Sequence, residues 1–237
     1  MISDNINTIR ERISRACARA GRPASDVTLI AVAKTFPAEA VREAIAAGAA
    51  DVGENYVQEL LAKRSELAAP TARWHFIGHL QSNKVRQIAP WIHMIHAVDS
   101  VPLATEIDRR ASGAGRVIEC LIEVNTTGEE TKFGIPPGDV SALVRSLAPC
   151  DHIVIGGLMT IGPFLPEAEG SRPMFRRLRE LKDEIAGIAQ ANVRMRHLSM
   201  GMTGDFEVAI EEGATHIRIG TAIFGPRTRA EHQRRTS

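Results

Sequence analysis

The chain of 237 residues lacks the features that mark secreted or membrane-spanning proteins. Its three cysteines, Cys17, Cys120 and Cys150, lie far apart and form no CxxC pair. A sparse, odd-numbered set of cysteines does not build a disulfide framework, so we expect a reducing, cytoplasmic location. No apolar run approaches the ~20 residues of a membrane helix, and Met1 leads into a polar segment rather than a signal peptide.

The sequence also has no large excess of positive or negative charge. The formal net charge is +1, which gives no global attraction to nucleic acid or to an anionic membrane. Residues 227–237 hold four arginines, and we expect a solvated basic tail there. The hydrophobic fraction of 44% is ordinary for a globular protein, and the length fits one large α/β domain that spans residues 1–237.

Apolar residues in the first segment, 1–20, recur at alternating steps of four and three, which predicts an amphipathic helix. The segment Val27–Ala33 follows; it is apolar on both faces and rich in β-branched residues, as in buried parallel strands. Strand-like and helix-like segments then alternate until eight strands are complete. This pattern predicts a single (β/α)8 barrel, with the first helix as an extra element over the bottom of the barrel.

Lys34 directly follows the first strand, at the end where reactive groups of (β/α)8 barrels lie. Alternation along the strand puts Ile30, Val32 and Lys34 on the face toward the barrel interior. A lysine that loses hydration there has a lowered pKa, and its amine becomes a nucleophile that can condense with an aldehyde. A lysine that extends into solvent from a strand end would have the same sequence position.

The turns after the seventh and eighth strands have the composition of a phosphate site. In (β/α)8 barrels, phosphate often binds at these two turns. Glycines there allow backbone N–H groups to approach an anion, and hydroxyl side chains can add to them. The residues concerned are Gly201, Gly204, Gly220, Ser199, Thr203 and Thr221.

Arg218 lies in the eighth strand with Ile217 and Ile219 on the opposite face, so its side chain is predicted to enter the barrel. A buried guanidinium is costly unless a partner satisfies it. Two partners fit the pattern: the carboxylate of Glu123, which also faces inward, or a ligand. An arginine that donates to a pyridine nitrogen is one way for a protein to tune a pyridoxal cofactor.

Two pairs of histidines, His75/His79 and His93/His96, have spacings that are compatible with a metal site. On a strand the first pair shares a face but the second does not, and no cluster of thiolates or carboxylates accompanies them. We therefore expect core or rim histidines and no metal.

Two loops carry weaker signals. Residues 161–173 form the longest irregular stretch, which fits a passive surface loop better than a lid. Glu129, Glu130 and Lys132 follow the fifth strand and fit a solvated charged turn, so a role for Lys132 in a site stays open.

Six segments, in order and over nearly the whole chain, resemble the YggS/PROSC family of pyridoxal phosphate-binding, or homeostasis, proteins. They are IAVAKTFP around Lys34, DVGENYVQEL around Asn55, WHFIGHLQSNK from Trp74, IGGLMTI from Ile155, HLSMGMTGDFEVAI and IRIGTAIFG. That family has the fold of the alanine racemase N-terminal domain. The resemblance therefore implies a fold-type III barrel that binds pyridoxal 5′-phosphate (PLP).

The resemblance implies that Lys34 carries PLP as a Schiff base, that Asn55 lies beside the cofactor, and that Arg218 faces the pyridine nitrogen. It also implies a phosphate grip made largely by backbone N–H groups, at Ser199, Met200, Gly201, Gly220 and Thr221. Departures from the family pattern are small: Thr203 stands where serine is frequent, and Phe133 where a small residue is common. The implied partners are PLP and, if it is handed on, apo forms of PLP-dependent enzymes.

Two features favour a carrier over an enzyme. A racemase needs an acid/base group on each face of the substrate α-carbon, and in two-domain alanine racemases the second group is a tyrosine from a C-terminal domain. Here the only tyrosine is Tyr56, and the sequence ends shortly after the eighth strand. A permanently charged Arg218 at the ring nitrogen would also make PLP a poorer electron sink. We therefore expect a monomeric PLP-homeostasis protein without efficient catalysis.

Two alternatives stay open at this stage. The first is a weak amino-acid racemase or another fold-type III PLP-dependent enzyme. The second is an aldolase-like barrel that forms Schiff bases on Lys34 without PLP.

Overall fold

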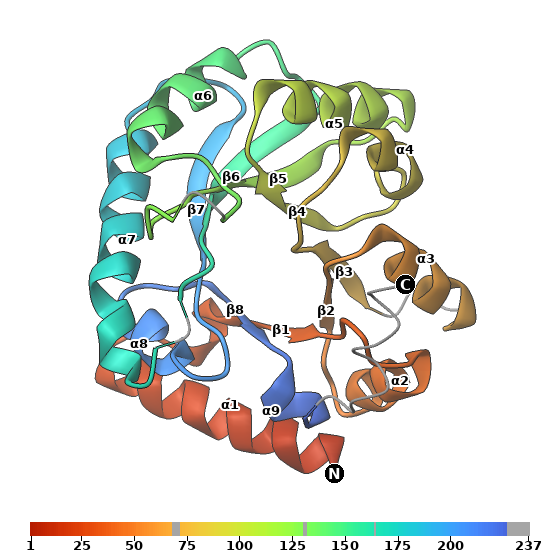
Figure 1. Cartoon of the computed structure of the whole chain (residues 1–237), viewed down its shortest axis with the longest axis vertical. Helices are drawn as coiled ribbons and strands as arrows, with labels where there is room; N and C mark the ends of the chain where they lie inside the picture. Colours follow the sequence, from red (N-terminus) through yellow and green to blue (C-terminus); the bar gives the residue numbers. More distant parts are fainter. Residues whose placement is uncertain (68–71, 130–131, 164, 227–237) are drawn as a thin grey trace.

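Eight parallel strands follow one another around a closed barrel in chain order, and β8 pairs with β1 (Figure 1). The structure, a computed structural model, describes residues 1–67, 72–129, 132–163 and 165–226. The strands are β1 (Thr28–Val32), β2 (Asp51–Glu54), β3 (Arg73–Phe76), β4 (Met94–Val98), β5 (Ile118–Glu123), β6 (Ile153–Met159), β7 (Val193–Ser199) and β8 (His216–Ile219). The predicted (β/α)8 barrel is confirmed.

Helices between the strands form the outer layer of the molecule (Figure 1). The α-helices are α1 (Ile2–Arg19), α2 (Ala38–Ala46), α3 (Val57–Glu66), α4 (Val85–Ile88), α5 (Val101–Gly113), α6 (Val140–Ser146), α7 (Arg172–Ala186), α8 (Phe206–Glu211) and α9 (Thr221–Phe224). In the described part of the chain, four short 3-10 helices precede strands or helices: η1 (Ala24–Asp26), η2 (Ser82–Lys84), η3 (Pro137–Asp139) and η4 (Ala168–Ser171).

The main hydrophobic core lies between the barrel and the helices, because one face of every strand is apolar. Ile217 and Ile219 of β8 and Cys120 and Ile122 of β5 are fully buried in this core. The alternation predicted for β8 and β5 therefore holds, and the opposite faces of these strands point into the barrel.

The barrel interior is unusually polar. Its apolar filling consists of two small clusters that are separate from the main core: Ile30, Val32 and Ile77 in one, and Met94, Leu121 and Met159 in the other. The remaining inward positions on several strands carry buried polar groups, namely His75, His96, Glu123, Ser199, His216 and Arg218. Buried polar groups must find hydrogen-bond partners, so the interior is organised by hydrogen bonds as much as by packing.

The predicted position of helix α1, over the bottom of the barrel, is wrong. Helix α1 lies in the outer ring against α8, α9 and α2 (Figure 1). The reason is that α8 has six residues and α9 four, which leaves the outer faces of β8 and β1 poorly covered. The apolar stripe of α1 fills this place with Ile6, Ile9, Ile13, Ala16 and Cys17, all buried. The Asn5 side chain also donates a hydrogen bond to the Ile223 carbonyl of α9 (2.9 Å).

Two strands end before the apolar sequence around them does. β3 ends at Phe76, although Ile77 and Leu80 follow it, and the apolar segment after Ile219 turns into α9. At the latter, the Phe224 N–H donates to the Gly220 carbonyl (3.0 Å), so the chain coils as soon as it leaves the barrel. Among the described residues, no helix is both long and apolar enough to span a membrane. The predicted tail, 227–237, lies outside the described residues.

Gly201, in the turn after β7, tests how tightly this end of the barrel is built. It has φ +91°, and an added Cβ would lie 2.6 Å from the Ala209 Cβ and 2.9 Å from the Phe206 Cα. We expect Gly201→Ala to lower the free energy of unfolding by about 2 kcal/mol or more, measured by urea denaturation. Gly204→Ala is the matched control, because a Cβ added there would meet no atom within 4 Å beyond its chain neighbours. Equal stabilities of the two variants would contradict the tight packing of this turn.

Candidate functional site

A cavity of about 240 Å³ opens at the C-terminal ends of the strands. It brings together five of the predicted site residues: Lys34 after β1, Asn55 after β2, Arg218 of β8, and Gly220 and Thr221 after β8. Much of the remaining wall is apolar, with Val32, Phe36, Ile77, Ile161, Pro163 and Leu165. An apolar cavity with a few converging polar groups is the usual form of a small-molecule site.

The structure places the other three predicted residues behind the cavity wall. The Met200 side chain is buried in the main core, and its N–H donates to the His216 carbonyl (3.1 Å). The Ser199 hydroxyl is fully buried against Arg218 (2.7 Å), and Gly201 packs on α8. Their part in holding a phosphate stays a prediction from the resemblance. The turn after β7 reaches the cavity instead through its next residues, Met202, Thr203 and Gly204.

A buried lysine, Lys63 of α3, fixes the turn that carries Lys34. Its ammonium donates to the carbonyl of Ala33 (2.6 Å), to Glu54 and to Glu59 (3.2 Å). Glu59 in turn accepts the N–H of Thr35 (2.8 Å). The residues on both sides of Lys34 are therefore held by one ionic cluster.

The backbone at Thr35 shows why such a clamp is needed. Thr35 has φ +72°, a left-handed conformation that a β-branched residue adopts only under constraint. Such a conformation costs on the order of 1–3 kcal/mol, which the surrounding contacts must offset. Burial raises the pKa of Glu54, and the adjacent Lys63 ammonium opposes that rise. Sequence reasoning missed Lys63, although it lies on the face of α3 that also buries Val57 and Leu60.

Asn55 is held beside the cavity by the close approach of a glycine. A Cβ on Gly78 would lie 2.4 Å from the carbonyl oxygen of Asn55, so only glycine allows this contact. The Oδ1 atom of Asn55 is buried without a hydrogen-bond partner among the described residues. An unpaired polar atom beside a cavity is costly, and a bound polar ligand would remove that cost.

Arg218 is buried, with 5% of its surface exposed, and among the described residues it forms no direct ion pair with Glu123. Its Nη1 donates to the Ser199 hydroxyl (2.7 Å) and its Nη2 to the Thr160 carbonyl (2.7 Å). Burial lowers the pKa of Arg218 to about 10, while the negative charge of Glu123 opposes the change. The side chain therefore stays charged at neutral pH and lines the cavity.

Glu123 faces the barrel interior, as predicted, and is 4% exposed. Its Oε2 has no hydrogen-bond partner among the described residues. Burial, together with the negative charge of Asp99, raises the pKa of Glu123 to about 7, against the lowering influence of Arg218.

The loop of residues 161–173, expected to be passive, forms part of the cavity wall. Four of its apolar side chains line the cavity, namely Ile161, Pro163, Leu165 and Ala168. The Ser171 hydroxyl donates to Asp205 Oδ2 (3.1 Å), and Asp205 Oδ1 accepts the N–H of Met202 (2.7 Å). The loop after β6 is thereby tied to the turn after β7.

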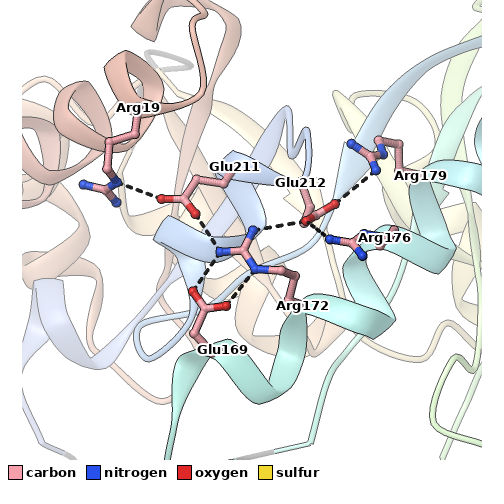
Figure 2. Close-up of polar contacts among 7 residues, drawn as sticks. All are labelled: Arg19, Glu169, Arg172, Arg176, Arg179, Glu211 and Glu212. Atoms are coloured by element: carbon pink, nitrogen blue, oxygen red, sulfur yellow. Dashed lines mark hydrogen bonds and ion pairs between the residues drawn. The ribbon is translucent and has the colours of Figure 1, made fainter.

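Arg172, the first residue of α7, anchors the same loop from the outside (Figure 2). Its guanidinium pairs with Glu169 of η4 (2.7 Å), Glu211 of α8 (2.7 Å) and the adjoining Glu212 (3.1 Å). Further pairs join Glu212 to Arg176 and Arg179, and Glu211 to Arg19 of α1. Isolated exposed ion pairs contribute little, but a network around the buried Glu212 fixes the loop relative to three helices.

At the opposite end of the barrel, Asp51, His75 and His93 bring their ligating atoms within 4.8 Å of one another. The sequence spacings did not include Asp51, which the register of β2 and β3 places opposite Arg73. Arg73 binds both carboxylate oxygens of Asp51 (2.7 Å each), and His75 Nε2 binds Oδ1 (2.9 Å). The carboxylate is thus already engaged by an arginine and a histidine. His79 lies apart from this group, near Asp99 (3.7 Å).

The charged turn after β5 matches its sequence interpretation in part. Lys132 pairs with Glu129 (2.7 Å), whose side chain is half exposed. Glu130 lies outside the described residues.

Comparisons with known proteins agree with this arrangement. The family described as alanine racemase, N-terminal domain, matches residues 5–228. The pyridoxal phosphate homeostasis protein of Aquifex aeolicus is 46% identical over 224 residues, which cover 94% of this chain and 97% of that protein. The human protein of the same name is 40% identical over 234 residues, covering 94% and 85%. The resemblance seen in the sequence is confirmed.

Solved structures give the same result. PipY of Synechococcus elongatus PCC7942, solved with PLP bound, has a TM-score of 0.82 and 37% identity, and the match covers 95% of this chain and 100% of PipY. An alanine racemase of Clostridium difficile 630 has a TM-score of 0.70 at 14% identity, covering 96% of this chain and 58% of the racemase. At that identity the likeness shows the fold alone.

Replacement of Lys63 tests the ionic clamp under Lys34. We expect Lys63→Met to lower the free energy of unfolding by about 3–5 kcal/mol, because it leaves buried Glu54 without its cation. Lys182→Met, at a more exposed lysine paired with its neighbour Asp183, is the control and should change stability by about 0.5 kcal/mol or less. Urea denaturation measures both. Unchanged stability of Lys63→Met would contradict the clamp.

The raised pKa of Glu123 predicts a pH dependence of stability. Between its ordinary pKa of 4.5 and the folded value of about 7, the folded protein keeps a proton that the unfolded chain releases. The stability associated with the protonated form is therefore lost as the pH rises through this window, by up to about 3 kcal/mol. Glu123→Gln cannot titrate, so its stability relative to the parent should increase from pH 5 to pH 8. A difference that does not change with pH in urea denaturation would contradict the raised pKa.

Proposed function

Because the chain belongs to the alanine racemase N-terminal domain family, we propose that it binds PLP as a Schiff base on Lys34 and serves intracellular PLP homeostasis. The observation that carries the proposal is the cavity itself, which gathers Lys34, Asn55, Arg218, Gly220 and Thr221 at one end of the barrel. Relatives named pyridoxal phosphate homeostasis proteins, and PipY with PLP bound, support the identity of the ligand.

The residues present fit this ligand. PLP supplies an electrophilic aldehyde carbon, a pyridine ring and a phosphate. Lys34 offers the amine, Arg218 a fixed cation deep in the cavity, and Asn55 an unsatisfied Oδ1 atom at the wall. Backbone N–H groups of the turns after β7 and β8 are suited to hold the phosphate, since Gly204 and Gly220 leave the backbone uncovered there.

Binding without efficient catalysis is the favoured form of the proposal. The charged Arg218 would oppose protonation of a pyridine nitrogen, which weakens the stabilisation of negative charge at a substrate α-carbon. Tyr56, the only tyrosine in the sequence, is 44% exposed at the start of α3 rather than enclosed in the cavity. A weak amino-acid racemase remains the alternative, supported by the fold shared with alanine racemases.

Delivery of PLP to apo-enzymes is supported by the surface around the cavity mouth. Five of the seven exposed large hydrophobic residues of the described chain lie in segments that follow strands, at the C-terminal end of the barrel. They are Tyr56, Val101, Phe133, Ile161 and Leu165. Exposed apolar side chains around a site favour contact with another protein.

The remaining parts of the proposal are a monomer, one domain and a cytoplasmic location. The three cysteines Cys17, Cys120 and Cys150 are buried and unpaired by disulfides, which suits a reducing compartment. Burial also raises the pKa of each thiol, so all three are poor nucleophiles.

An absorbance titration with PLP tests the proposed function. We expect the purified protein to gain the visible band of a protonated Schiff base, and Lys34→Ala to lose it. Lys84→Ala is the control lysine, outside the cavity lining. The loaded protein should then reactivate an apo-transaminase. A protein that takes up no PLP would contradict the proposal, and turnover of an alanine or serine enantiomer that depends on Lys34 would favour the racemase alternative.

A further inference from the structure

A continuous series of hydrogen bonds crosses the barrel interior from the cavity to the opposite end. Arg218 Nη1 donates to Ser199 Oγ (2.7 Å), which lies 2.9 Å from His96 Nδ1. His96 Nε2 lies 3.0 Å from His75 Nδ1, and His75 Nε2 lies 2.9 Å from Asp51 Oδ1. We call this series the interior chain. Its five members come from five different strands and are all buried.

The protons of the interior chain can be assigned from its acceptor end. Asp51 is ionised and only accepts: burial would raise its pKa, but hydrogen bonds from His75 and Arg73 hold that pKa below its usual range. His75 Nε2 therefore carries a proton. The proton between His75 Nδ1 and His96 Nε2 is assigned from the cavity end of the series.

The assignment extends to the cavity end. Among the described residues, the Ser199 hydroxyl contacts only Arg218, which can only donate, and His96 Nδ1, so its proton points to His96 Nδ1. Burial lowers the pKa of His96 well below its ordinary value, so its ring is neutral and its one proton lies on Nε2, which donates to His75 Nδ1. Every donor points the same way, from the Arg218 cation toward the Asp51 carboxylate.

The interior chain offsets part of the cost of burying the charged Arg218 side chain. A buried guanidinium needs acceptors and a counter-charge, yet Arg218 has no carboxylate among its hydrogen-bond partners in the described chain. Aligned hydrogen bonds in a low-dielectric interior polarise one another. The interior chain thus links Arg218 to a carboxylate at the far end of the barrel, where Arg73 holds Asp51 from the half-exposed rim.

We propose that Ser199 and His96 are positioning residues, which hold the Arg218 guanidinium in one orientation toward the cofactor ring. They act through Arg218 and do not line the cavity themselves. This inference rests on the proposed PLP function for its consequence, but the interior chain itself exists without a ligand. Replacement of the Ser199 hydroxyl removes an acceptor from Arg218 and a donor from His96 in one step.

The ligand-free protein provides the first test. Nitrogen-15 NMR spectra of the histidine rings should show His96 and His75 as neutral rings with the proton on Nε2. Ser199→Ala should shift the signals of His96 Nδ1 and Arg218 Nε–H. A proton on Nδ1 of neutral His96, or unchanged signals in Ser199→Ala, would overturn the assignment even if the protein binds PLP.

The PLP-loaded protein provides the second test. We expect Ser199→Ala to weaken PLP binding about tenfold or more, because a hydrogen bond to a charged group is lost. The pH midpoint of the visible band should also move in the direction found for Arg218→Gln. In an Arg218→Gln background, Ser199→Ala should have no further effect on either quantity. An equal effect in both backgrounds would show a general structural role and overturn the proposal.

Two controls separate the possible causes of a negative result. His197→Gln changes an interior histidine that pairs with Glu119 (3.1 Å) and lies outside the interior chain, so it should leave both the PLP affinity and the band unchanged. Thermal unfolding identifies any variant that fails to fold. If Ser199→Ala does not fold, Ser199→Cys replaces it, because it changes only the hydroxyl oxygen to sulfur. If the parent protein takes up no PLP, the proposed function fails, and the NMR arm alone decides the interior chain.

Discussion

Burial of the Arg218 guanidinium inside a closed barrel is the constraint on which the rest of the interior depends. A charged group with five N–H donors cannot lie among aliphatic side chains without a large cost. Inside the barrel, the Thr160 carbonyl and the Ser199 hydroxyl accept hydrogen bonds from Arg218, and His96 and His75 continue the series behind Ser199. The usual filling of branched aliphatic residues is accordingly reduced to two small clusters.

A second buried cation, Lys63, supports the turn that carries Lys34. It holds the backbone on both sides of Lys34, where Thr35 adopts a conformation that the chain would not take alone. Arg218 therefore offers a fixed donor that suits a pyridine nitrogen. Lys63 fixes the backbone beside Lys34, whose amine suits an aldehyde. Much of the cavity wall is apolar, and the polar groups of the site are held in fixed positions before any ligand binds.

Much of this arrangement could be predicted from the sequence because it follows from strand periodicity. Alternation gave the correct inward face for Arg218 and Glu123, and the rule for parallel barrels gave the correct end for Lys34. The partners of these residues could not be predicted, because they depend on tertiary contacts between elements: Ser199 of β7 contacts Arg218 of β8, and Lys63 of α3 contacts the Ala33 carbonyl after β1. Spacing alone has no information on such contacts.

The position of α1 and the part played by residues 161–173 were misjudged for a related reason. Both depend on surfaces that the neighbouring elements leave uncovered. Helix α1 packs where the short α8 and α9 cover the barrel poorly, and the loop packs at the open mouth of the barrel. An amphipathic helix or an irregular loop does not reveal its partner in its own sequence.

A crystal structure of the protein grown with PLP would show whether Lys34 and Arg218 hold the cofactor together. We expect continuous density from the Lys34 side chain to the cofactor, with the ring nitrogen within hydrogen-bond distance of Arg218 and the phosphate at the turns after β7 and β8. PLP bound at another lysine, or in the cavity with its phosphate against Arg218, would contradict this expectation.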